Sequence, residues 1–206
     1  MIRILLNRLI FKINNRSCKI GRNVIISRHT IIGKNCKIAN NTHLSKTVQL
    51  GNNVEIGEYS RLRKISLGNY SVVESGVKVV GTSIGNIKIG KHCYVGINNV
   101  LDTSDNISIG NFVHIAGPST ALWCHSSAKM CLNSIPINDK ERDKFRSTAP
   151  ISIGDNVYIG GNCTIYPDVT IGHHSIVAPN SAVTKSFPPY SMIGGVPAVK
   201  IKKIRI

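Results

Sequence analysis

The sequence predicts an all-β fold built from a repeating coil, and two observations carry this prediction. Aliphatic residues recur every six positions over nearly the whole chain, and the fourth residue after each of them is nearly always small. A period of six fits neither an amphipathic helix nor a simple two-faced strand, whereas it fits a short strand, a corner and a second short strand. Three such hexads close a triangular coil, and successive coils stack at about 4.8 Å, the spacing of paired strands.

The repeat positions hold their register in long runs. All of them are Ile, Leu or Val, and twenty-two positions taken in threes predict about seven coils. Cysteines at the small position are expected to act as small buried hydrophobic groups; these are Cys36, Cys93 and Cys163. The aliphatic positions are 20, 26, 32, 38, 44, 50, 56, 62, 67, 73, 79, 89, 95, 101, 109, 115, 153, 159, 165, 171, 177 and 183.

The charge balance indicates anionic partners. Lys and Arg outnumber Asp and Glu by 26 to 10, and residues 1–54 hold ten basic residues and no acidic one. Such basic ends suit phosphate groups, an acidic polymer or a membrane surface. With aromatic residues at only 5% and no nucleic-acid motif, we expect no nucleic-acid partner.

The sequence favours a cytoplasmic location. No apolar run approaches the roughly 20 residues that cross a bilayer, and Arg8 interrupts the short apolar stretch at the N-terminus, where no cleavage site follows. The inner face of the membrane is the alternative location. We also expect the six cysteines to be free thiols, because no C-x-x-C pair or framework spacing is present.

One long break interrupts the repeat between about Ala121 and Pro150. In a solenoid such an insertion forms an external loop, and loops of this kind often carry function. His125 is the one histidine outside the six-residue register, so we expect its replacement to spare the fold. A histidine that acts as a general base is typically worth 10²- to 10⁴-fold in rate. His114, on the coil just before the loop, is the reserve candidate, and the other histidines are expected at the solvated rim.

Three C-terminal segments resemble the hexapeptide-repeat acyltransferases. They are Ile153-Gly154-Asp155-Asn156-Val157-Tyr158-Ile159-Gly160-Gly161, Val183-Thr184-Lys185 and Gly194-Gly195-Val196-Pro197-Ala198. The resemblance covers roughly residues 20–200, and the most similar branch is the acetyl-CoA-dependent O-acetyltransferases of sugars. It implies a left-handed parallel β-helix, acetyl-CoA as co-substrate, and a homotrimer with each active site between two subunits.

The resemblance also implies roles for single residues. His125 stands where the catalytic base of the family stands. The expected cofactor-binding residues are Gly160, Gly161, Ala178, Lys185 and Lys200; the resemblance places Ala178 at the pantetheine arm, and the two glycines leave room for that arm. Phosphate groups are assigned to Lys185 and to one or more of the cations of the acid-free C-terminal cluster, which are Lys200, Lys202, Lys203 and Arg205. As an alternative, these cations form a solvated charged tail. The implied acceptor contacts are Asn98, Asp102 and Trp123; as alternatives, Asn98 and Asp102 are turn residues and Trp123 anchors the loop.

The chain divides into three parts on this evidence. Residues 1–19 are expected to form a helix that either caps the first coil or lies on an anionic membrane. Residues 20–200 form the β-helix, with the external loop at 121–150, and residues 201–206 form a basic tail.

The leading function is transfer of acetyl from acetyl-CoA to a hydroxyl of a surface polysaccharide, such as capsule or O-antigen, or of its precursor. The net charge of +16 favours an acidic acceptor. One alternative is an acetyltransferase for a small molecule such as an antibiotic, a free sugar or a nucleotide-linked amino sugar, and another is a β-helix module without catalysis. A metal-dependent version of the fold needs three histidines around zinc; the chain lacks the H-x4-H pair of that version, so we expect no metal.

Overall fold

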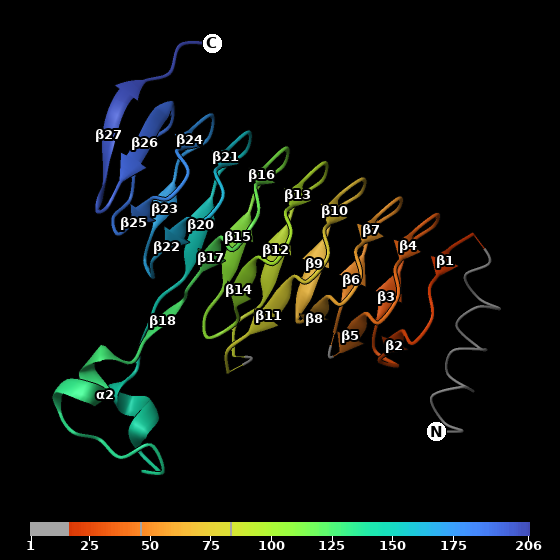
Figure 1. Ribbon diagram of the computed structural model, residues 1–206, viewed down its shortest axis with the longest axis horizontal. Helices are drawn as coiled ribbons and strands as arrows, with labels where there is room; N and C mark the ends of the chain where they lie inside the picture. The colour runs from red at the N-terminus through yellow and green to blue at the C-terminus, as the bar shows by residue number, and fades with distance from the viewer. Residues whose placement is uncertain (1–16, 46, 83) are drawn as a thin grey trace.

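The computed structural model describes residues 17–45, 47–82 and 84–206, which wind into a solenoid of short strands (Figure 1). Three sheets run along it, with ten strands in sheet A, eight in sheet B and seven in sheet C. Neighbouring strands pair in parallel and in register, as Lys37 with Glu55 and Val79 with Leu101 show. Homologous hexads therefore stack directly on one another, and the predicted all-β, left-handed parallel β-helix is confirmed.

The strands are two to six residues long. Sheet A contains β1 (Lys19–Ile20), β4 (Lys37–Ile38), β7 (Glu55–Ile56), β10 (Val72–Val73), β13 (Tyr94–Val95), β16 (His114–Ile115), β21 (Tyr158–Ile159), β24 (Ile176–Val177), β26 (Ser191–Gly195) and β27 (Ala198–Lys203). Sheet B contains β2 (Ile25–Ile26), β5 (His43–Ser45), β8 (Arg61–Arg63), β11 (Lys78–Val80), β14 (Val100–Asp102), β17 (Ala121–Leu122), β22 (Thr164–Ile165) and β25 (Ala182–Val183). Sheet C contains β3 (Ile31–Ile32), β6 (Gln49–Leu50), β9 (Ile65–Leu67), β12 (Ile87–Ile89), β15 (Ile107–Ile109), β20 (Ile151–Ile153) and β23 (Thr170–Ile171).

The core is a continuous column of aliphatic side chains inside the triangle. Leu44, Leu101 and Ile159 are fully buried, and each such side chain contributes about 1.5–3 kcal/mol by leaving water. The cysteines at the small repeat position are buried as predicted; these are Cys36, Cys93 and Cys163. Many corners hold an asparagine with a positive φ, for example Asn53 at 57°, because asparagine tolerates the left-handed region better than most residues.

The coils outnumber the predicted seven. Sheet A alone has nine strands in parallel succession, from β1 to β26. The repeat counted from an unbroken register omits Leu122, Phe187 and Ile193, which are buried in the core although their spacing departs from six. The coil tolerates such departures because the extra or missing residues are taken up at its corners.

One corner takes up most of these departures. We call the corner between a sheet B strand and the next sheet C strand the B/C corner, and the corner between a sheet A strand and the next sheet B strand the A/B corner. The breaks in register at residues 62–67, 79–89 and 101–109 all fall at the B/C corner, between β8 and β9, β11 and β12, and β14 and β15. The external loop leaves from the same corner, after β17.

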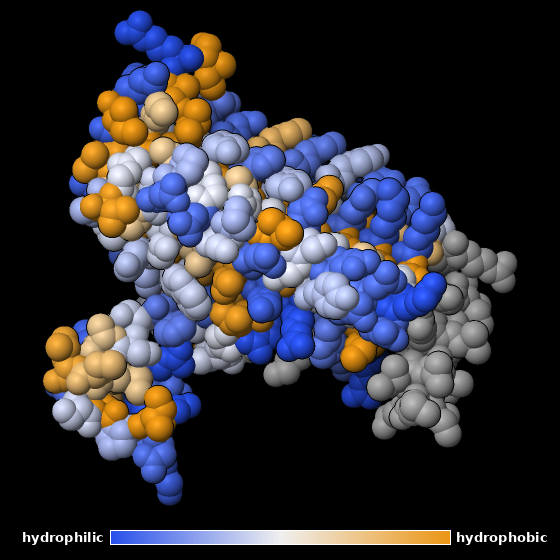
Figure 2. All heavy atoms as spheres, viewed as in Figure 1, coloured by the Kyte–Doolittle hydropathy of each residue, from blue (hydrophilic) through white to orange (hydrophobic). Residues whose placement is uncertain are grey.

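The external loop stands away from the coil (Figure 1). It contains β18 (His125–Ser126), α2 (Ala128–Leu132), the short 3-10 helix η1 (Arg142–Phe145) and β19 (Ser147–Thr148), and β18 pairs antiparallel with β19. Leu132 and Ile137 in this loop are 83% and 77% exposed, and apolar atoms lie at its surface in Figure 2. The loop thus begins and ends in a strand pair that fixes its root on the coil.

The two ends of the chain differ in how they finish. At the C-terminal end β27 folds back on β26 as an antiparallel hairpin, so the folded part continues to Lys203, past the expected boundary at residue 200. Of the helix expected over residues 1–19, residues 1–16 lie outside the described residues, and β1 begins at Lys19. No helix in the described part of the chain is long and apolar enough to cross a membrane.

Candidate active site

The root of the external loop places His125 at the B/C corner. Leu122 is the last core residue of β17, and His125 begins the β18–β19 pair three positions later, opposite Thr148. The backbone C=O of Cys124 accepts a hydrogen bond from Ala149 N–H at 3.0 Å. Both strands of the root therefore hold the backbone of His125, and its side chain is 21% exposed.

The His125 ring is bound to a buried carboxylate. Its Nδ1 lies 2.5 Å from Oδ2 of Asp102 and 3.2 Å from Oγ of Ser104. Asp102 is fully buried at the end of β14. Its two oxygens also accept hydrogen bonds from Ser104 N–H at 2.9 Å, Ser104 O–H at 2.8 Å and Cys124 N–H at 3.0 Å. Both carboxylate oxygens of Asp102 are thus paired with groups of the same chain.

These contacts decide the charge of Asp102. Burial alone raises the pKa of a carboxyl group, but the hydrogen bonds from His125 and Ser104 outweigh it and hold the pKa of Asp102 below its ordinary value. The carboxylate is therefore charged at neutral pH. Because a carboxylate only accepts, Nδ1 of His125 carries a proton, which leaves Nε2 as the one ring nitrogen that can accept.

The fully buried position of Asp102 differs from its expected role. The sequence places it among the acceptor contacts, yet its side chain has no exposed surface and its oxygens face His125, Ser104 and Cys124. The physical reason is that coil stacking places Asp102 one coil below the root of the loop. Asp102 therefore contacts His125 and not solvent.

A glycine makes room for this carboxylate. Gly81 has φ +92°, in the left-handed region, and a Cβ added to it would lie 2.0 Å from Oδ1 of Asp102 and 2.9 Å from the backbone N of Ser104. A side chain at Gly81 would therefore displace the group that holds His125. Gly81 lies in the break of register at 79–89, so this irregularity of the coil serves the site.

The sequence did not single out Ser104. It is 2% exposed and contacts both Asp102 and His125. The break in register at 101–109, which contains both Asp102 and Ser104, was the one signal that could have pointed to it.

The thiol next to His125 is no nucleophile. Cys124 is fully buried, and burial together with the nearby charge of Asp102 raises the pKa of its thiol to about 12. Only a thiolate attacks efficiently, so this thiol is unsuited to act as a nucleophile at neutral pH.

Trp123 flanks the histidine. The rings of Trp123 and His125 meet edge to face, with centroids 6.0 Å apart at 88°, and Trp123 is partly exposed. Its position beside the imidazole is compatible with both roles that the sequence left open, anchoring the loop and contacting an acceptor.

His114 lies in a different setting. It points outward from sheet A, with its ring 4.4 Å from that of Tyr94 and 5.4 Å from that of Tyr158. Partial burial lowers its pKa. The structure offers His114 no carboxylate partner among the described residues, whereas it gives one to His125.

The expected cofactor glycines serve coil stacking. A Cβ on Gly160 would lie 2.5 Å from the backbone N of Pro179, and one on Gly161 would lie 2.6 Å from the backbone O of Gly117. Neighbouring coils therefore occupy the space that a side chain would need at either glycine. The N–H of Gly160 donates to Val177 O at 2.9 Å.

The remaining expected residues are spread over two corners and one edge. Ala178 lies at the A/B corner, where its N–H donates to Ile193 O at 2.8 Å and its C=O accepts from Ser181 Oγ at 2.6 Å. Asn98 lies at the same corner, exposed, with φ 56°. Lys185 follows β25 at the B/C corner, and Lys200 lies on the edge strand β27; both are exposed.

The structure thus brings together Trp123, Asp102 and His125 at the B/C corner. It leaves Asn98, Gly160, Gly161 and Ala178 at the A/B corner, at the other end of the sheet B strands. About five residues lie between the two corners of one coil, as from Pro118 to Trp123, so the corners are about 15 Å apart.

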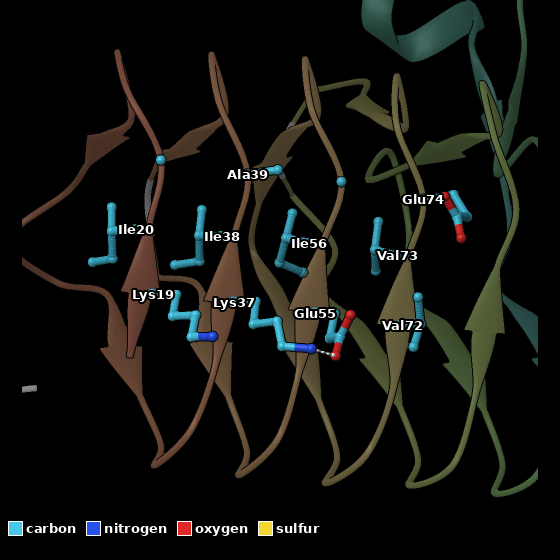
Figure 3. Close-up of a pocket in the computed structure, with 12 residues that line it drawn as sticks. Lys19, Ile20, Lys37, Ile38, Ala39, Glu55, Ile56, Val72, Val73 and Glu74 are labelled. Atoms are coloured by element: carbon cyan, nitrogen blue, oxygen red, sulfur yellow. Dashed lines mark hydrogen bonds and ion pairs between the residues drawn. The ribbon is translucent and has the colours of Figure 1, made fainter. Parts of the chain in front are cut away.

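A separate pocket of about 430 Å³ lies over the N-terminal strands of sheet A (Figure 3). Lys37 and Glu55 face each other in it at 2.5 Å. It contains no histidine, cysteine or hydroxyl group and lies several coils from His125. The B/C corner is therefore the candidate active site. Within the described ranges, no three His, Cys, Asp or Glu side chains are grouped to hold a metal ion.

Comparison with known proteins agrees with this architecture. A family model described as bacterial transferase hexapeptide (six repeats) matches residues 29–64 and 150–185. The chain carries this hexapeptide repeat. The predicted resemblance to hexapeptide-repeat acyltransferases is confirmed.

Individual relatives match over part of their length. A galactoside O-acetyltransferase from Escherichia coli (strain K12) is 34% identical over 120 residues, which are 58% of this chain and 55% of that protein. A chloramphenicol acetyltransferase from Klebsiella aerogenes is 30% identical over 112 residues, 50% of this chain and 53% of that protein. The chain therefore spans about half the length of these curated relatives.

A solved structure matches over most of its length. The crystal structure of the polySia specific acetyltransferase NeuO has a TM-score of 0.56 with this chain at 23% identity, covering 92% of this chain and 88% of the other. At this level of identity the likeness shows a shared fold.

Proposed function

We propose that the protein is an acetyltransferase that moves an acetyl group from acetyl-CoA to a hydroxyl of a glycan or of its precursor. The observation that carries the proposal is the buried Asp102 carboxylate 2.5 Å from Nδ1 of His125, at the root of the external loop. The names of the two curated relatives and of the solved structure, all of them acetyltransferases, support the reaction class.

His125 acts as the general base in this proposal. Asp102 holds the ring with Nδ1–H donating, so Nε2 is available to take the proton from the acceptor hydroxyl. The charged carboxylate then stabilises the imidazolium that forms. Trp123 offers an aromatic surface beside the ring, which suits the apolar face of a sugar.

Acetyl-CoA supplies an activated thioester, so the chain has only to position it and to remove the proton. Lys185 and Lys200 are exposed, and neither has a carboxylate partner among the described residues, which suits the phosphate groups of the co-substrate. Neither N–H nor C=O of Ala178 is without a partner. Ala178 therefore offers the pantetheine arm no unpaired backbone group.

A homotrimer completes the site in this proposal. The His125 corner and the Gly160–Ala178 corner lie about 15 Å apart within one chain, and a second chain packed beside the first can bring the opposite corners together. The exposed Leu132 and Ile137 of the external loop give the loop apolar surface for such packing.

A second candidate acceptor is a small molecule, and the match to a chloramphenicol acetyltransferase favours it. A panel of free sugars, glycan oligomers and chloramphenicol, assayed for acetyl-CoA consumption, separates the two acceptor classes. Consumption with none of them, together with intact acetyl-CoA binding, would favour a β-helix module without catalysis.

The base is tested by His125→Asn. The sequence predicted that losing this ring would spare the fold, but removing the partner of a buried carboxylate is itself destabilising. Asparagine keeps an N–H donor for Asp102 while it removes Nε2. We expect kcat to fall by about 10²- to 10⁴-fold, with the melting temperature and acetyl-CoA binding retained.

His114→Asn is the matched control. It removes a ring that stacks on tyrosines instead of facing a carboxylate, so we expect most of the activity to remain. Near wild-type turnover in His125→Asn, or loss of turnover in His114→Asn alone, would show that the base is elsewhere.

A further inference from the structure

A basic groove of about 370 Å³ lies on the outer face of sheet B. It covers the strands β5, β8 and β11, the coils that lead up to the His125 site. We call it the basic groove; it is lined by His43, Ser45, Arg61, Leu62, Arg63, Lys78, Val79, Val80 and Gly81.

His43, Arg61 and Lys78 form a column in the basic groove. His43 pairs in register with Arg61, and Arg61 with Lys78, so the three lie one above another at about 4.8 Å per step. All three are exposed. Like charges directly opposite each other in a sheet are destabilising, so the column costs stability in the free protein.

No carboxylate offsets this charge. All ten Asp and Glu residues of the chain lie in its described part, and none of them forms an ion pair with Arg61 or Lys78. The contrast with sheet A is direct, because there Lys37 faces Glu55 at 2.5 Å (Figure 3). The basic groove therefore presents unopposed positive charge to solvent.

The basic groove ends at the B/C corner, beside Asp102. Lys78 pairs with Val100 and Val80 with Asp102. Gly81 closes the groove and lies against the carboxylate of Asp102, and Arg63 Nη2 donates to the C=O of Gly81 at 2.5 Å. Lys78 is two strand spacings, about 10 Å, from β17, the strand that leads into His125, and Arg61 is about 15 Å away.

We propose that the basic groove binds the carboxylate groups of an acidic glycan chain and guides that chain to His125. The inference rests on the proposed acetyltransferase function and names the acceptor class for it. Arg61 and Lys78 each pair with a carboxylate of the chain, since guanidinium and ammonium groups both bind carboxylates by charge-assisted hydrogen bonds. A column two steps long fits a polymer of charged sugars better than one monosaccharide, because only a chain reaches both the cations and His125.

The test is binding of labelled oligomers to the whole protein. The acidic probes are fluorescent oligogalacturonate and oligosialate, and the neutral probe is carboxyl-reduced oligogalacturonate. We expect the wild type to bind an acidic probe and not the neutral one, with affinity falling as salt rises. In the double variant Arg61→Gln, Lys78→Gln we expect about tenfold weaker binding, since each exposed ion pair contributes modestly.

The matched control is the double variant Lys88→Gln, Lys91→Gln. It removes the same charge from exposed lysines outside the basic groove, so we expect wild-type affinity. Equal weakening in the control would mean that net charge alone binds the probe, and it would overturn the proposal. Binding of neither acidic probe by the wild type, or equal binding of the neutral one, would overturn it too.

Steady-state kinetics separate this proposal from the function on which it rests. The double variant Arg61→Gln, Lys78→Gln should raise the KM for the acidic acceptor about tenfold and leave the KM for acetyl-CoA unchanged. If only the KM for acetyl-CoA rose, the basic groove would bind the phosphate groups of acetyl-CoA, and the proposal would be overturned. If the protein transferred acetyl efficiently to neutral acceptors, and the double variant did so at the wild-type rate, the inference would be overturned but the proposed function would stand. Selective binding of acidic probes without any acetyl transfer would overturn only the function.

Discussion

The carboxyl group of Asp102 connects the coil to the histidine at the loop root. It accepts hydrogen bonds on both oxygens from groups up to 23 positions away in the chain. Burial penalises its charge, yet these hydrogen bonds keep its pKa below the ordinary value. The imidazole of His125 is thereby held in one tautomer and one orientation.

Replacing Asp102 should therefore reduce turnover without affecting cofactor binding. In Asp102→Asn the amide cannot accept from Nδ1–H in the same way as a charged carboxylate, so the ring loses its fixed tautomer. We expect kcat to fall about 10²-fold, within the range that general bases supply, while the KM for acetyl-CoA stays unchanged. The measurement is steady-state kinetics across pH. A variant with wild-type kcat over the whole range would show that Asp102 does not position the base.

The same residue predicts a pH dependence of stability. Because its pKa in the folded state lies below the ordinary value of 3.8, the folded protein binds fewer protons here than the unfolded chain in acid. The stability that Asp102 contributes is complete above about pH 4 and is lost as the pH falls through its folded pKa. The melting-temperature gap between wild type and Asp102→Asn should shrink over that range, while the exposed Asp168→Asn should show no gap. A gap that stays constant in acid would contradict the assignment.

Single residues show where inference from sequence ends. His125 is recognisable in the sequence because it is the one histidine outside the six-residue register. The sequence marks Asp102 as a residue of interest but does not predict its contact with His125. Between positions 102 and 125 the chain winds forward by one coil, and an irregular corner lies between them. The contacts of Ser104 with Asp102 and His125 could not be predicted for the same reason. The six-residue period locates residues that keep the register, and the candidate site consists of residues that break it.

The corner glycines carry the stacking of the coils at the scale of the element. Gly57 and Gly160 occupy the same position at the A/B corner of different coils, and a Cβ on either would lie 2.4–2.5 Å from a backbone nitrogen of the next coil. Backbone cannot move aside as a flexible side chain can. The fold was predictable in detail because this contact recurs coil after coil, whereas the number of coils was not, since corners absorb insertions.

Gly160→Ala should lower stability rather than cofactor affinity. Overpacking of this kind costs about 1–3 kcal/mol, so we expect a melting temperature several degrees lower in thermal unfolding. Gly57→Ala, far from the expected cofactor corner, should show a similar loss. If Gly160→Ala instead kept the wild-type melting temperature and raised the KM for acetyl-CoA, the original expectation of a pantetheine contact would hold.

The whole chain carries its two candidate half-sites at opposite corners. His125 lies at the B/C corner, whereas Ala178 and Pro179 lie at the A/B corner, about 15 Å away along sheet B. If both serve one reaction, the reacting groups come from two chains. In a ring of three, each interface then joins the B/C corner of one chain to the A/B corner of the next, which is a heterologous contact.

This arrangement predicts complementation between two inactive variants. His125→Asn lacks the base, and Pro179→Trp places a bulky ring on the exposed A/B corner, so each alone should be inactive. In trimers formed by co-expressing both chains equally, an interface is active when the intact B/C corner of a Pro179→Trp chain meets the intact A/B corner of a His125→Asn chain. Random assembly gives this pairing in about one interface in four. We therefore expect activity near a quarter of the wild type, at a mass three times the chain mass of 22.4 kDa. Trimers without recovered activity would place the whole site within one chain, and a monomeric mass would remove the basis for a shared site.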